Sequence, residues 1–437
     1  MSRRPAEFGD RTVSQAFCIT PIMLPLASKL GSHARMIHYM TPQGVGDAWV
    51  GNELRGVKNA GVQFSLHALN APASTYFSSD DIQQMKDETR VIYPVSLFRV
   101  LVGLVVGPFL FGTRYFQVLG NALFGARESL KHRLVALWQC CIAIVWARDL
   151  RHETVDLIHC QWIHSAGTVG MYGAWLLDVP FGFTGHAADL FRNRIALLDK
   201  IQRAEYIVCI SYFHRDFFLI HGASPKQLKI MYCGIDPNQF TVRTPRPRGE
   251  KLIIASSGRL VEKKGFDELI RGCAELRSHI QFECRIAGSG PLEDELNALI
   301  RELNLTDCVT VTGEPLLQEK IAEFMHGADC YCLPCVWASD NDVDGLPQML
   351  MEAMACGLPV VSTRLVGIPD LVKDGETGLL IEPNDPAAIA AALIRLHEDQ
   401  SMADRLAENG RSWVVEKFNL ETCLEPLITE YQKRISS

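Results

Sequence analysis

The sequence has no excess of positive charge, because 43 lysine and arginine residues face 50 aspartate and glutamate residues and leave a net charge of −7. This balance argues against nucleic acid as a partner. The 14 cysteines lack the regular pairing of a disulfide framework, so we expect a reducing, cytoplasmic compartment. Tandem repeats and low-complexity tracts are missing too. With 48% hydrophobic and 21% charged residues among 437, a soluble globular protein of two or three domains is predicted.

Hydrophobic runs long enough to span a bilayer are also lacking. Residues 1–34 are predicted to be a poorly ordered leader without the cleavage site of a signal peptide. The two most apolar stretches, 100–113 and 134–147, are shorter than the roughly 20 residues that a spanning helix needs. We expect core helices of a large domain here, and the alternative is peripheral contact with a membrane surface.

What the sequence does contain is an alternation of strand and helix patterns in two series. Short apolar runs separated by helical stretches predict parallel sheets covered by helices. The predicted strands of the first series are 34–40, 62–67, 155–159, 181–184 and 206–210, and those of the second are 251–255, 282–287, 309–312, 330–333 and 359–362. We place a first domain at 35–240, with a helix-rich apolar insertion at 75–150, and a second domain at 251–410. A linker with two prolines joins them at 241–250, and the final segment at 411–437 has a helical pattern.

The strongest local signal follows the strand that opens the second domain. The loop from Ser256 to Gly265 contains two glycines and precedes a helix predicted at 266–276, so it offers backbone N–H groups and a helix dipole to an anion. Arg259 can fork onto phosphate oxygens, and Lys264 adds a point charge. The alternative is a solvated basic turn, which the position at the carboxyl end of a strand disfavours.

A second signal is the segment 344–361, in which Pro347 suits the first turn of a helix and Gly357 suits its end. Asp344 precedes that helix and Glu352 lies within it. A carboxylate can accept both hydroxyls of a ribose, and free N–H groups at the helix start can meet a phosphate or a sugar. The alternative is a core-facing helix with a surface glutamate.

Several motifs together resemble the C-terminal domain of family 4 glycosyltransferases in order and spacing: GRLVEKKG, IAGSGPLEDEL, DGLPQMLMEAMACGLPVVS and GIPDLVKDGETGLLI. The resemblance is dense from 250 to 395, looser before that in IHCQWIHSAG and FTGHAADLF, and weakest at 75–150. It implies a retaining enzyme of the GT-B fold, with two doubly wound α/β domains facing across a cleft. It also implies that the first domain binds the acceptor, that the second binds the donor, and that the C-terminal helix crosses back to the first.

The resemblance assigns roles to individual residues. Arg259 and Lys264 correspond to the basic pair on the donor diphosphate, and Glu352 corresponds to the acid on the ribose. Asp344 takes the place of the first acid beside the donor sugar, where glutamate is usual, and is one methylene shorter. His186 resembles the histidine that faces the donor sugar from the first domain. The other implied donor-site residues are Gly44, Gly46, Gly258, Gly345 and Leu346.

The implied activity is transfer of a sugar from a nucleoside diphosphate sugar, with UDP or GDP, to a hydroxyl of a glycan, glycolipid or small acceptor. Arg259 and Lys264 can stabilise the charge that develops on the diphosphate, so neither a divalent metal nor another cofactor is expected. Front-face attack by the acceptor hydroxyl fits the resemblance. The alternatives are another GT-B sugar-nucleotide enzyme, such as an epimerase or a phosphorylase, and a binding protein with decayed catalytic residues. We expect a cytoplasmic protein, peripheral to the membrane if the acceptor is lipid-linked.

Two further patterns are not interpreted as metal sites. The run from Asp340 to Gly345 resembles the start of a calcium loop, but position 12 of that loop is Met351 rather than a bidentate acid. Cys332 and Cys335 form a pair without the second pair that a zinc site needs, and are predicted to be buried and reduced.

Overall fold

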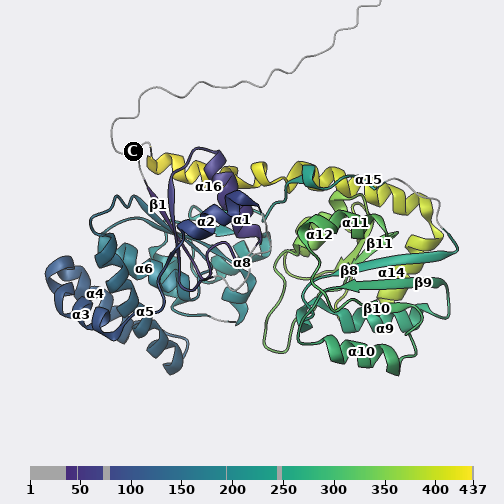
Figure 1. Cartoon of the computed structure of the whole chain (residues 1–437), viewed down its shortest axis with the longest axis horizontal. Coiled ribbons are helices and arrows are strands. Elements are labelled where there is room, and N and C mark those ends of the chain that lie inside the picture. The colour runs from purple at the N-terminus through teal and green to yellow at the C-terminus, as the bar shows by residue number, and fades with distance from the viewer. Residues whose placement is uncertain (1–35, 47, 72–78, 193, 244–248, 436–437) are drawn as a thin grey trace, which may run out of the picture. The chain divides into compact units, whose positions relative to one another are not determined.

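The structure is a computed structural model that describes residues 36–46, 48–71, 79–192, 194–243 and 249–435. The predicted leader lies outside these residues. Two parallel sheets form the described chain, as the alternating pattern predicts, and both belong to one compact unit (Figure 1).

The first sheet has seven parallel strands in the order β3-β2-β1-β4-β5-β6-β7. Its register sets Ile37 opposite both Phe64 and Leu157. The hydrophobic runs predicted five of these strands; the other two, β3 and β7, are only two and three residues long and lie at the sheet edges, too short for such a run. The strands are β1 (Ile37–Thr41), β2 (Phe64–Ala68), β3 (Arg90–Val91), β4 (Leu157–Gln161), β5 (Phe181–Gly185), β6 (Tyr206–Cys209) and β7 (Leu228–Ile230).

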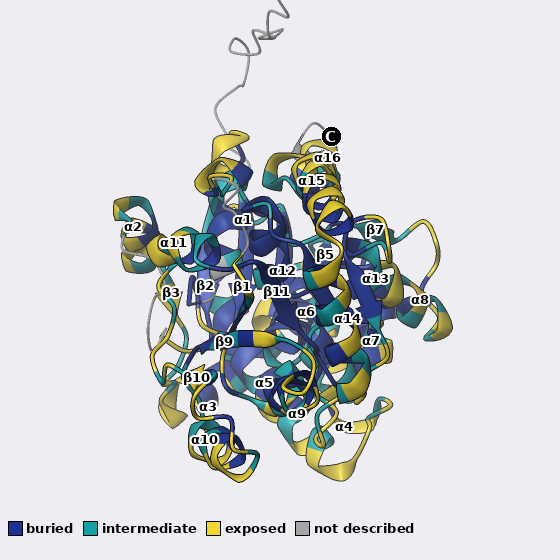
Figure 2. Ribbon diagram, turned by 90° about the vertical axis from the view of Figure 1, so that its right-hand side faces the viewer, coloured by how far each residue is buried: buried dark blue, intermediate teal, exposed yellow. Residues whose placement is uncertain are grey.

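Helices cover both faces of this sheet, and their exposed residues lie on the outer side while the strands are buried (Figure 2). A short π-helical turn, Ala188–Arg192, follows β5, and a 3₁₀ turn, Pro237–Gln239, follows β7. The α-helices are α1 (Ala48–Asn59), α2 (Asp80–Glu88), α3 (Leu97–Phe111), α4 (Thr113–Phe124), α5 (Leu130–Leu150), α6 (Ser165–Leu177), α7 (Leu197–Arg203) and α8 (Tyr212–Ile220).

The apolar region before β4 consists of α3, α4 and α5. Ser96 and Ser129 cap α3 and α5, because each side chain accepts a hydrogen bond from the first turn. Within the described ranges, α5 is the one helix long and apolar enough to cross a membrane by length and composition, yet half of that apolar window is buried inside the protein. From Ala136 onward α5 is mostly buried and packs against α3 and α6, so this half is a core helix.

The second sheet has six parallel strands in the order β10-β9-β8-β11-β12-β13. They are β8 (Lys251–Ser257), β9 (Gln281–Ala287), β10 (Val309–Val311), β11 (Cys330–Leu333), β12 (Val360–Thr363) and β13 (Leu379–Ile381). The covering helices are α9 (Phe266–Leu276), α10 (Glu293–Glu302), α11 (Ile321–His326), α12 (Gln348–Ala355), α13 (Ile368–Leu371), α14 (Pro386–Glu398) and α15 (Gln400–Lys417), with 3₁₀ turns at Glu262–Lys264 and Gln318–Lys320.

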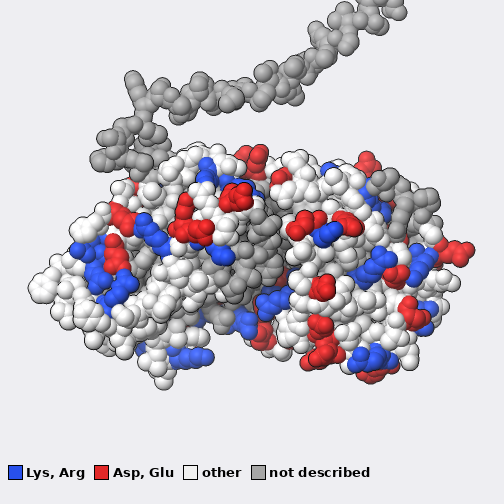
Figure 3. All heavy atoms as spheres, in the orientation of Figure 1, with Lys and Arg blue, Asp and Glu red and all other residues white. Residues whose placement is uncertain are grey.

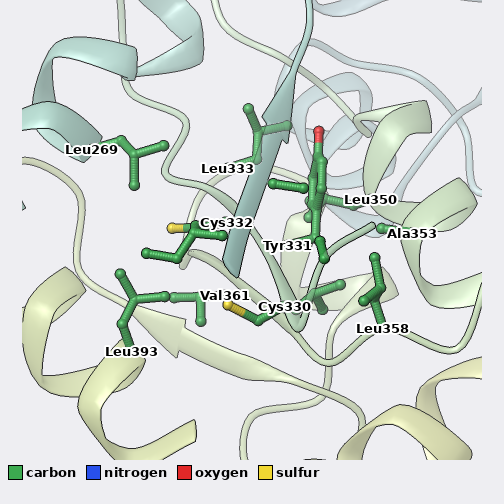
Figure 4. Close-up of a cluster of buried hydrophobic side chains, with 14 of the residues drawn as sticks. Leu269, Cys330, Tyr331, Cys332, Leu333, Leu350, Ala353, Leu358, Val361 and Leu393 are labelled. Atoms are coloured by element: carbon green, nitrogen blue, oxygen red, sulfur yellow. The ribbon is translucent and has the colours of Figure 1, made fainter. Parts of the chain in front are cut away.

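The core of the second sheet is centred on β11 (Figure 4). Cys332 points toward Leu269 of α9 and Leu393 of α14, whereas Tyr331 points to the opposite face, toward Leu350 of α12. This alternation is the period of two of a strand with both faces buried. Cys332 and Cys335 are buried and form no disulfide, in agreement with the prediction for this pair.

The last helix, α16 (Leu420–Ile435), packs against α1 and β7 of the first sheet. The helical structure is interrupted between α15 and α16. There the Leu420 N–H donates to the carbonyl of Ile235, and the Ile235 N–H donates to the carbonyl of Phe418. Further along, the Tyr431 hydroxyl bonds to the Tyr39 hydroxyl of β1, and both rings are fully buried. The final helical segment is therefore two helices, and the second of them completes the core of the first sheet.

Each sheet has a point where the strand order reverses. In the first sheet, β2 and β3 follow on one side of β1, and β4 is then added on the other side of β1. In the second sheet, β9 and β10 follow on one side of β8, and β11 is added on its other side. The loops after two such neighbouring strands lead to opposite faces of the sheet and leave a crevice at their carboxyl ends, where open α/β sheets bind ligands.

Candidate functional site

A cavity of about 560 Å³ lies at the carboxyl ends of the strands of the second sheet. Its wall consists of the ends of β8 and β9 with the loops that follow them, the segment after β10, and the start of α12. From the first sheet's side, Trp49 of α1 also lines it. The volume is within the range of small-molecule sites. The residues involved are Trp49, Ser257, Gly258, Arg259, Lys264, Ala287, Gly288, Ser289, Gly290, Pro315, Leu316, Gln318, Ile321, Gln348, Met349 and Glu352.

The floor of the cavity is formed by backbone, because glycines let two loops approach closely. A Cβ atom added to Gly288 would lie 1.9 Å from the carbonyl oxygen of Gly258, closer than any real contact. The N–H of Leu260 donates to the carbonyl of Ser289 across the same contact. The IAGSG segment is therefore part of the site, and Gly258 lies where the sequence predicted it.

Of the two helix starts predicted to meet a ligand, only that of α12 lines the cavity. The first residues of α9 do not line it, because the 3₁₀ turn Glu262–Lys264 separates β8 from α9 and moves the helix start away. Instead, Gln348 and Met349 at the start of α12 line the cavity. At the other end of α12, Gly357 has a φ of +75° and its N–H donates to Met354, the helix end predicted for this residue.

Arg259 and Lys264 both line the cavity, but their surroundings differ. Arg259 is exposed, and among the described residues its guanidinium has neither a hydrogen bond nor an ion pair. Lys264 Nζ is paired with Asp344 Oδ2, and the neighbouring Lys263 Nζ lies 3.1 Å from Asp344 Oδ1. An anion that enters the cavity therefore meets one available guanidinium and one ammonium that a carboxylate already holds.

Asp344 lies at the centre of a buried ionic cluster. Burial alone would raise its pKa, but the charges of Lys264 and Lys263 outweigh burial and lower the pKa of Asp344 to about 2. Lys263 also lies 3.2 Å from Asp342 Oδ2, and Arg192 lies 2.8 Å from Asp340 Oδ2. The acidic segment that resembles a calcium loop is thus occupied by cationic side chains of this chain. Asp344 remains ionised throughout the physiological pH range.

Glu352 lies on the inner face of α12 and is buried, with its Oε2 atom lacking a hydrogen-bond partner. Burial raises the pKa of Glu352 to about 7, while a hydrogen bond from Gln318 and the charge of Lys264 act weakly in the opposite direction. A buried oxygen without a partner at a cavity wall is costly unless a ligand satisfies it. The surface glutamate of the alternative interpretation is therefore wrong.

The pKa of Glu352 predicts a specific pH dependence. In the unfolded chain this group ionises near 4.5, so between pH 4.5 and 7 the folded protein holds a proton that the unfolded chain releases, and stability falls as pH rises. Between pH 5 and pH 7.5 we expect the free energy of unfolding of the wild type to fall by about 2 kcal/mol more than that of the Glu352→Gln variant. Urea unfolding of both proteins at the two pH values measures it.

The comparison isolates Glu352, because Glu53, whose pKa burial also raises to about 7, is present in both proteins and its contribution cancels. Equal pH slopes for the wild type and the variant would contradict the buried, protonated state of Glu352.

Five of the predicted donor-site residues are not at the cavity wall: Asp344, which reaches it only through its contact with Lys264, and the residues Gly44, Gly46, Gly345 and Leu346. Gly345 and Leu346 are buried, and the carbonyl of Gly345 accepts the N–H of Gly367. Gly44 and Gly46 form a turn after β1 in which the Gly44 N–H donates to Thr41 Oγ1 at 2.6 Å. This glycine turn leads directly into α1, so it positions Trp49 rather than lining the cavity itself.

His186 directly follows β5 and is buried between two indole rings. Its ring centroid lies 4.2 Å from that of Trp49 and 4.6 Å from that of Trp162. The Nε2 atom is 3.1 Å from Gln161 Oε1, and the Gln161 amide donates to Glu53. Burial, assisted by neighbouring histidines, lowers the pKa of His186 well below its ordinary value, so the imidazole is neutral. His186 itself does not line the cavity, but Trp49, which its ring contacts, does.

The sequence analysis did not predict the contacts around this cluster of tilted aromatic rings. Trp162 has a φ of +70°, an uncommon conformation for a residue with a side chain. Asp189 Oδ2 accepts the N–H groups of Ile163 and His186, and the fully buried Lys200 donates to the carbonyls of Ile163 and Ile195. Trp162 and Asp189 carried a signal, since both lie within motifs of the family resemblance, and Asp189 was a weaker candidate beside His186 with a helix N-cap as the alternative. Lys200 carried none.

Two family models match the chain without a gap between them. Residues 239–413 match the model of glycosyl transferases group 1, and residues 124–239 match that of glycosyltransferase family 4. Over 200 residues the chain is 36% identical to WcaL of Salmonella typhimurium, whose name assigns it to colanic acid biosynthesis, covering 45% of this chain and 49% of that protein. It is 34% identical over 242 residues to the amylovoran biosynthesis glycosyltransferase AmsK of Erwinia amylovora, covering 54% and 59%. The chain thus spans about half the length of the curated relatives it matches.

Solved structures with the same fold include HepE of Anabaena in complex with UDP and glucose, with a TM-score of 0.66 and 16% identity over 91% of this chain and 100% of that one. Sucrose-phosphate synthase of Thermosynechococcus elongatus gives a TM-score of 0.69 and 17% identity over 92% and 99%. With both family models matched in sequence order, and with two parallel Rossmann-like sheets, the chain belongs to the family 4 glycosyltransferases of the GT-B fold.

Proposed function

We propose that this protein transfers a sugar from a nucleoside diphosphate sugar to an acceptor hydroxyl, with retention of anomeric configuration and without a divalent metal. The observation that carries the proposal is the cavity at the β8/β11 reversal point, where Arg259, Lys264 and the buried Glu352 face one space. Two cations and an unpartnered carboxylate oxygen match a diphosphate and a ribose diol.

In the proposed donor complex, the diphosphate contacts Arg259 and replaces Asp344 as the ion-pair partner of Lys264. Asp344 keeps its second lysine, Lys263, and its released oxygen becomes available to a sugar hydroxyl. As the bond between sugar and diphosphate breaks, positive charge develops on the anomeric carbon and negative charge on the leaving phosphate. Arg259 and Lys264 stabilise the latter, and this electrostatic contribution replaces that of a metal.

His186 is proposed to act from the opposite side of the donor sugar. Its neutral imidazole can exchange hydrogen bonds with a hydroxyl if the Trp49 ring, which contacts it and lines the cavity, moves aside. Among the described residues, Glu352 is the one carboxylate that lines the cavity, and it is assigned to the ribose rather than to a nucleophile role. We therefore favour front-face attack by the acceptor hydroxyl.

The names of relatives support this class of reaction. WcaL and AmsK are named for the biosynthesis of colanic acid and amylovoran, HepE was solved with UDP and glucose, and a relative 30% identical over 230 residues is a GDP-mannose-dependent mannosyltransferase of Mycolicibacterium smegmatis. We propose UDP or GDP as the nucleotide and a hexose as the sugar. The acceptor is a hydroxyl of a glycan, a glycolipid or a small molecule, reached in the cytoplasm or at the cytoplasmic face of a membrane.

Nucleotide binding is the first test. UDP, GDP and ADP are added to the full chain at concentrations far above micromolar, with inorganic phosphate as control. We expect one nucleoside diphosphate to raise the melting temperature by about 5 °C, because a ligand at about 100 times its Kd adds about 2.7 kcal/mol to the free energy of unfolding. Phosphate alone should give no comparable shift, since it cannot reach Glu352.

If all nucleotides leave the melting temperature unchanged, the proposed donor site is wrong. With a responding nucleotide identified, NMR of the transferred sugar's anomeric proton separates retention from inversion. Donor conversion without transfer to any hydroxyl would favour an epimerase instead.

A further inference from the structure

The helices α3, α4 and the first half of α5 expose large apolar side chains that the protein's own core does not cover. On α3 these form one stripe, Phe98, Leu101, Val105 and Phe109, each between 61% and 88% exposed. Their spacing of three and four residues places them on one side of the helix. The opposite side of α3, with Val100, Gly103, Gly107 and Phe111, is buried against α5 and α4.

Helix α3 is therefore apolar on all sides although one side faces outward. Its 15 residues contain a single charged residue, Arg99. A helix of this length is about 22 Å long, too short to cross a hydrocarbon core of about 30 Å. A second stripe, Leu130, Leu134 and Trp138, is exposed on α5, which packs beside α3. An apolar surface over two adjoining helices marks an interaction site.

The charge of this region differs from that of the whole chain. Between Leu97 and Trp138 the sequence contains five lysine and arginine residues and one acidic residue, Glu128, in a protein whose net charge is −7. Three of the five cations, Arg99, Arg114 and Arg127, pair with aspartates outside this range, which leaves Lys131 and Arg133. The carboxylate of Glu128 accepts the N–H groups of Ala196 and Leu197. Within the described residues, Lys131 and Arg133 at the start of α5 pair with no carboxylate.

Figure 3 shows the same contrast, since the end of the molecule where Figure 1 places α3 and α4 is largely white, with blue residues beside it. Apolar stripes flanked by cations are complementary to a surface that is apolar inside and anionic at its edge. A second copy of this chain fits less well, because pairing the two stripes would bring the same cations together.

We propose that the α3 stripe, with Lys131 and Arg133, docks this protein on an anionic lipid bilayer as a peripheral protein. Crossing the bilayer is disfavoured, because it would remove the buried half of α5 from the core. The docking itself is independent of catalysis. Only its use, presenting a lipid-linked acceptor hydroxyl to the first domain, rests on the proposed function. The stretch 134–147 is thus mainly core, and the surface that meets lipid lies mostly N-terminal to it.

The experiment is sedimentation of the full chain with vesicles of phosphatidylcholine containing 30% phosphatidylglycerol, and with vesicles of phosphatidylcholine alone, at low salt. The wild type should bind the anionic vesicles at least tenfold more strongly. Val105→Ser with Phe109→Ser should weaken binding about tenfold or more, as should Lys131→Gln with Arg133→Gln. The matched control is Ile220→Ser, because Ile220 of α8 is 82% exposed and lies outside this surface.

Three results would overturn the proposal: no binding of the wild type to anionic vesicles, equal binding of the α3 variant and the control, or a dimer in light scattering that the α3 variant dissociates. The variants change exposed residues, except for Arg133, which is half-buried and donates to the carbonyl of Leu123. The nucleotide-induced melting shift of every variant should match that of the wild type. A variant that loses vesicle binding but keeps the nucleotide-induced melting shift is defective in the docking surface alone. If no protein, including the wild type, shows the nucleotide-induced melting shift, the proposed function is contradicted instead.

Discussion

Arg259→Ala is expected to lower turnover of the nucleoside diphosphate sugar by about 10²-fold or more. Arg259 lines the cavity with an unpaired guanidinium, so its full charge is available to the leaving diphosphate. Loss of one preorganised charge from the transition state costs a few kcal/mol, whereas its loss from ground-state binding costs less. The measurement is initial-rate kinetics with the donor nucleotide identified by melting shifts, with kcat and KM determined separately.

Lys264→Ala should have an effect of similar size for a related reason. This substitution removes the second cation, and it also leaves Asp344 bound to Lys263 alone. The matched control is Arg301→Ala, since Arg301 is an exposed arginine of α10 on the same domain and lies outside the cavity. The control should retain wild-type kinetics. Near-wild-type turnover in either Arg259→Ala or Lys264→Ala would contradict the assignment of these residues to the diphosphate.

Gly265→Ala is expected to destabilise the folded protein by about 3 kcal/mol or more. Gly265 has a φ of +66°, where a side chain costs about 1–2 kcal/mol. In addition, an added Cβ would lie 2.0 Å from the carbonyl oxygen of Pro334, just after β11, so the backbone has to move. Overpacking of this kind costs about 1–3 kcal/mol further. The free energy of unfolding in urea is the measurement.

Gly375→Ala is the matched control, because Gly375 has a nearly identical φ of +74° but no atom within 4 Å of an added Cβ. It should cost about 1 kcal/mol, the conformational part alone. Since Gly265 follows Lys264 directly, the Gly265 variant should also lose most of the nucleotide-induced melting shift, which the Gly375 variant keeps. If the two variants were equally stable, the close approach of Gly265 to Pro334 would be disproved.

Local signals predicted the elements whose pattern is complete within a few residues. The helix at 266–276 is present, and the neighbouring Gly258 and Arg259 line the cavity, because glycine, cation and strand end are adjacent in sequence. The helix end at Gly357 followed from the need for positive φ. The strands β3, β7 and β13 were not predicted, since two or three residues carry no period.

Contacts between distant residues were beyond such signals. Lys264 and Asp344 are 80 residues apart, so the resemblance assigned both to the donor without indicating that they neutralise each other. The predicted role of Gly44 and Gly46 stays a prediction, and the structure brings Trp49 to the cavity instead. His186 lies under that ring because β1, β4 and β5 are neighbours or near neighbours in the sheet, an order that the chain sequence does not display.

The sequence by itself determined that this chain forms two parallel α/β sheets, and it placed a glycine loop with a cation after the first strand of the second, because strand period, glycine loops and capping residues act over short distances. Only the tertiary structure decided that Glu352 is buried without a partner, that Asp344 holds Lys264, and that α3 turns an apolar stripe outward. These three properties depend on which side chains the fold packs against each other and which it leaves exposed to solvent. Packing and exposure are set by the whole folded chain, so no single segment of the sequence predicts them.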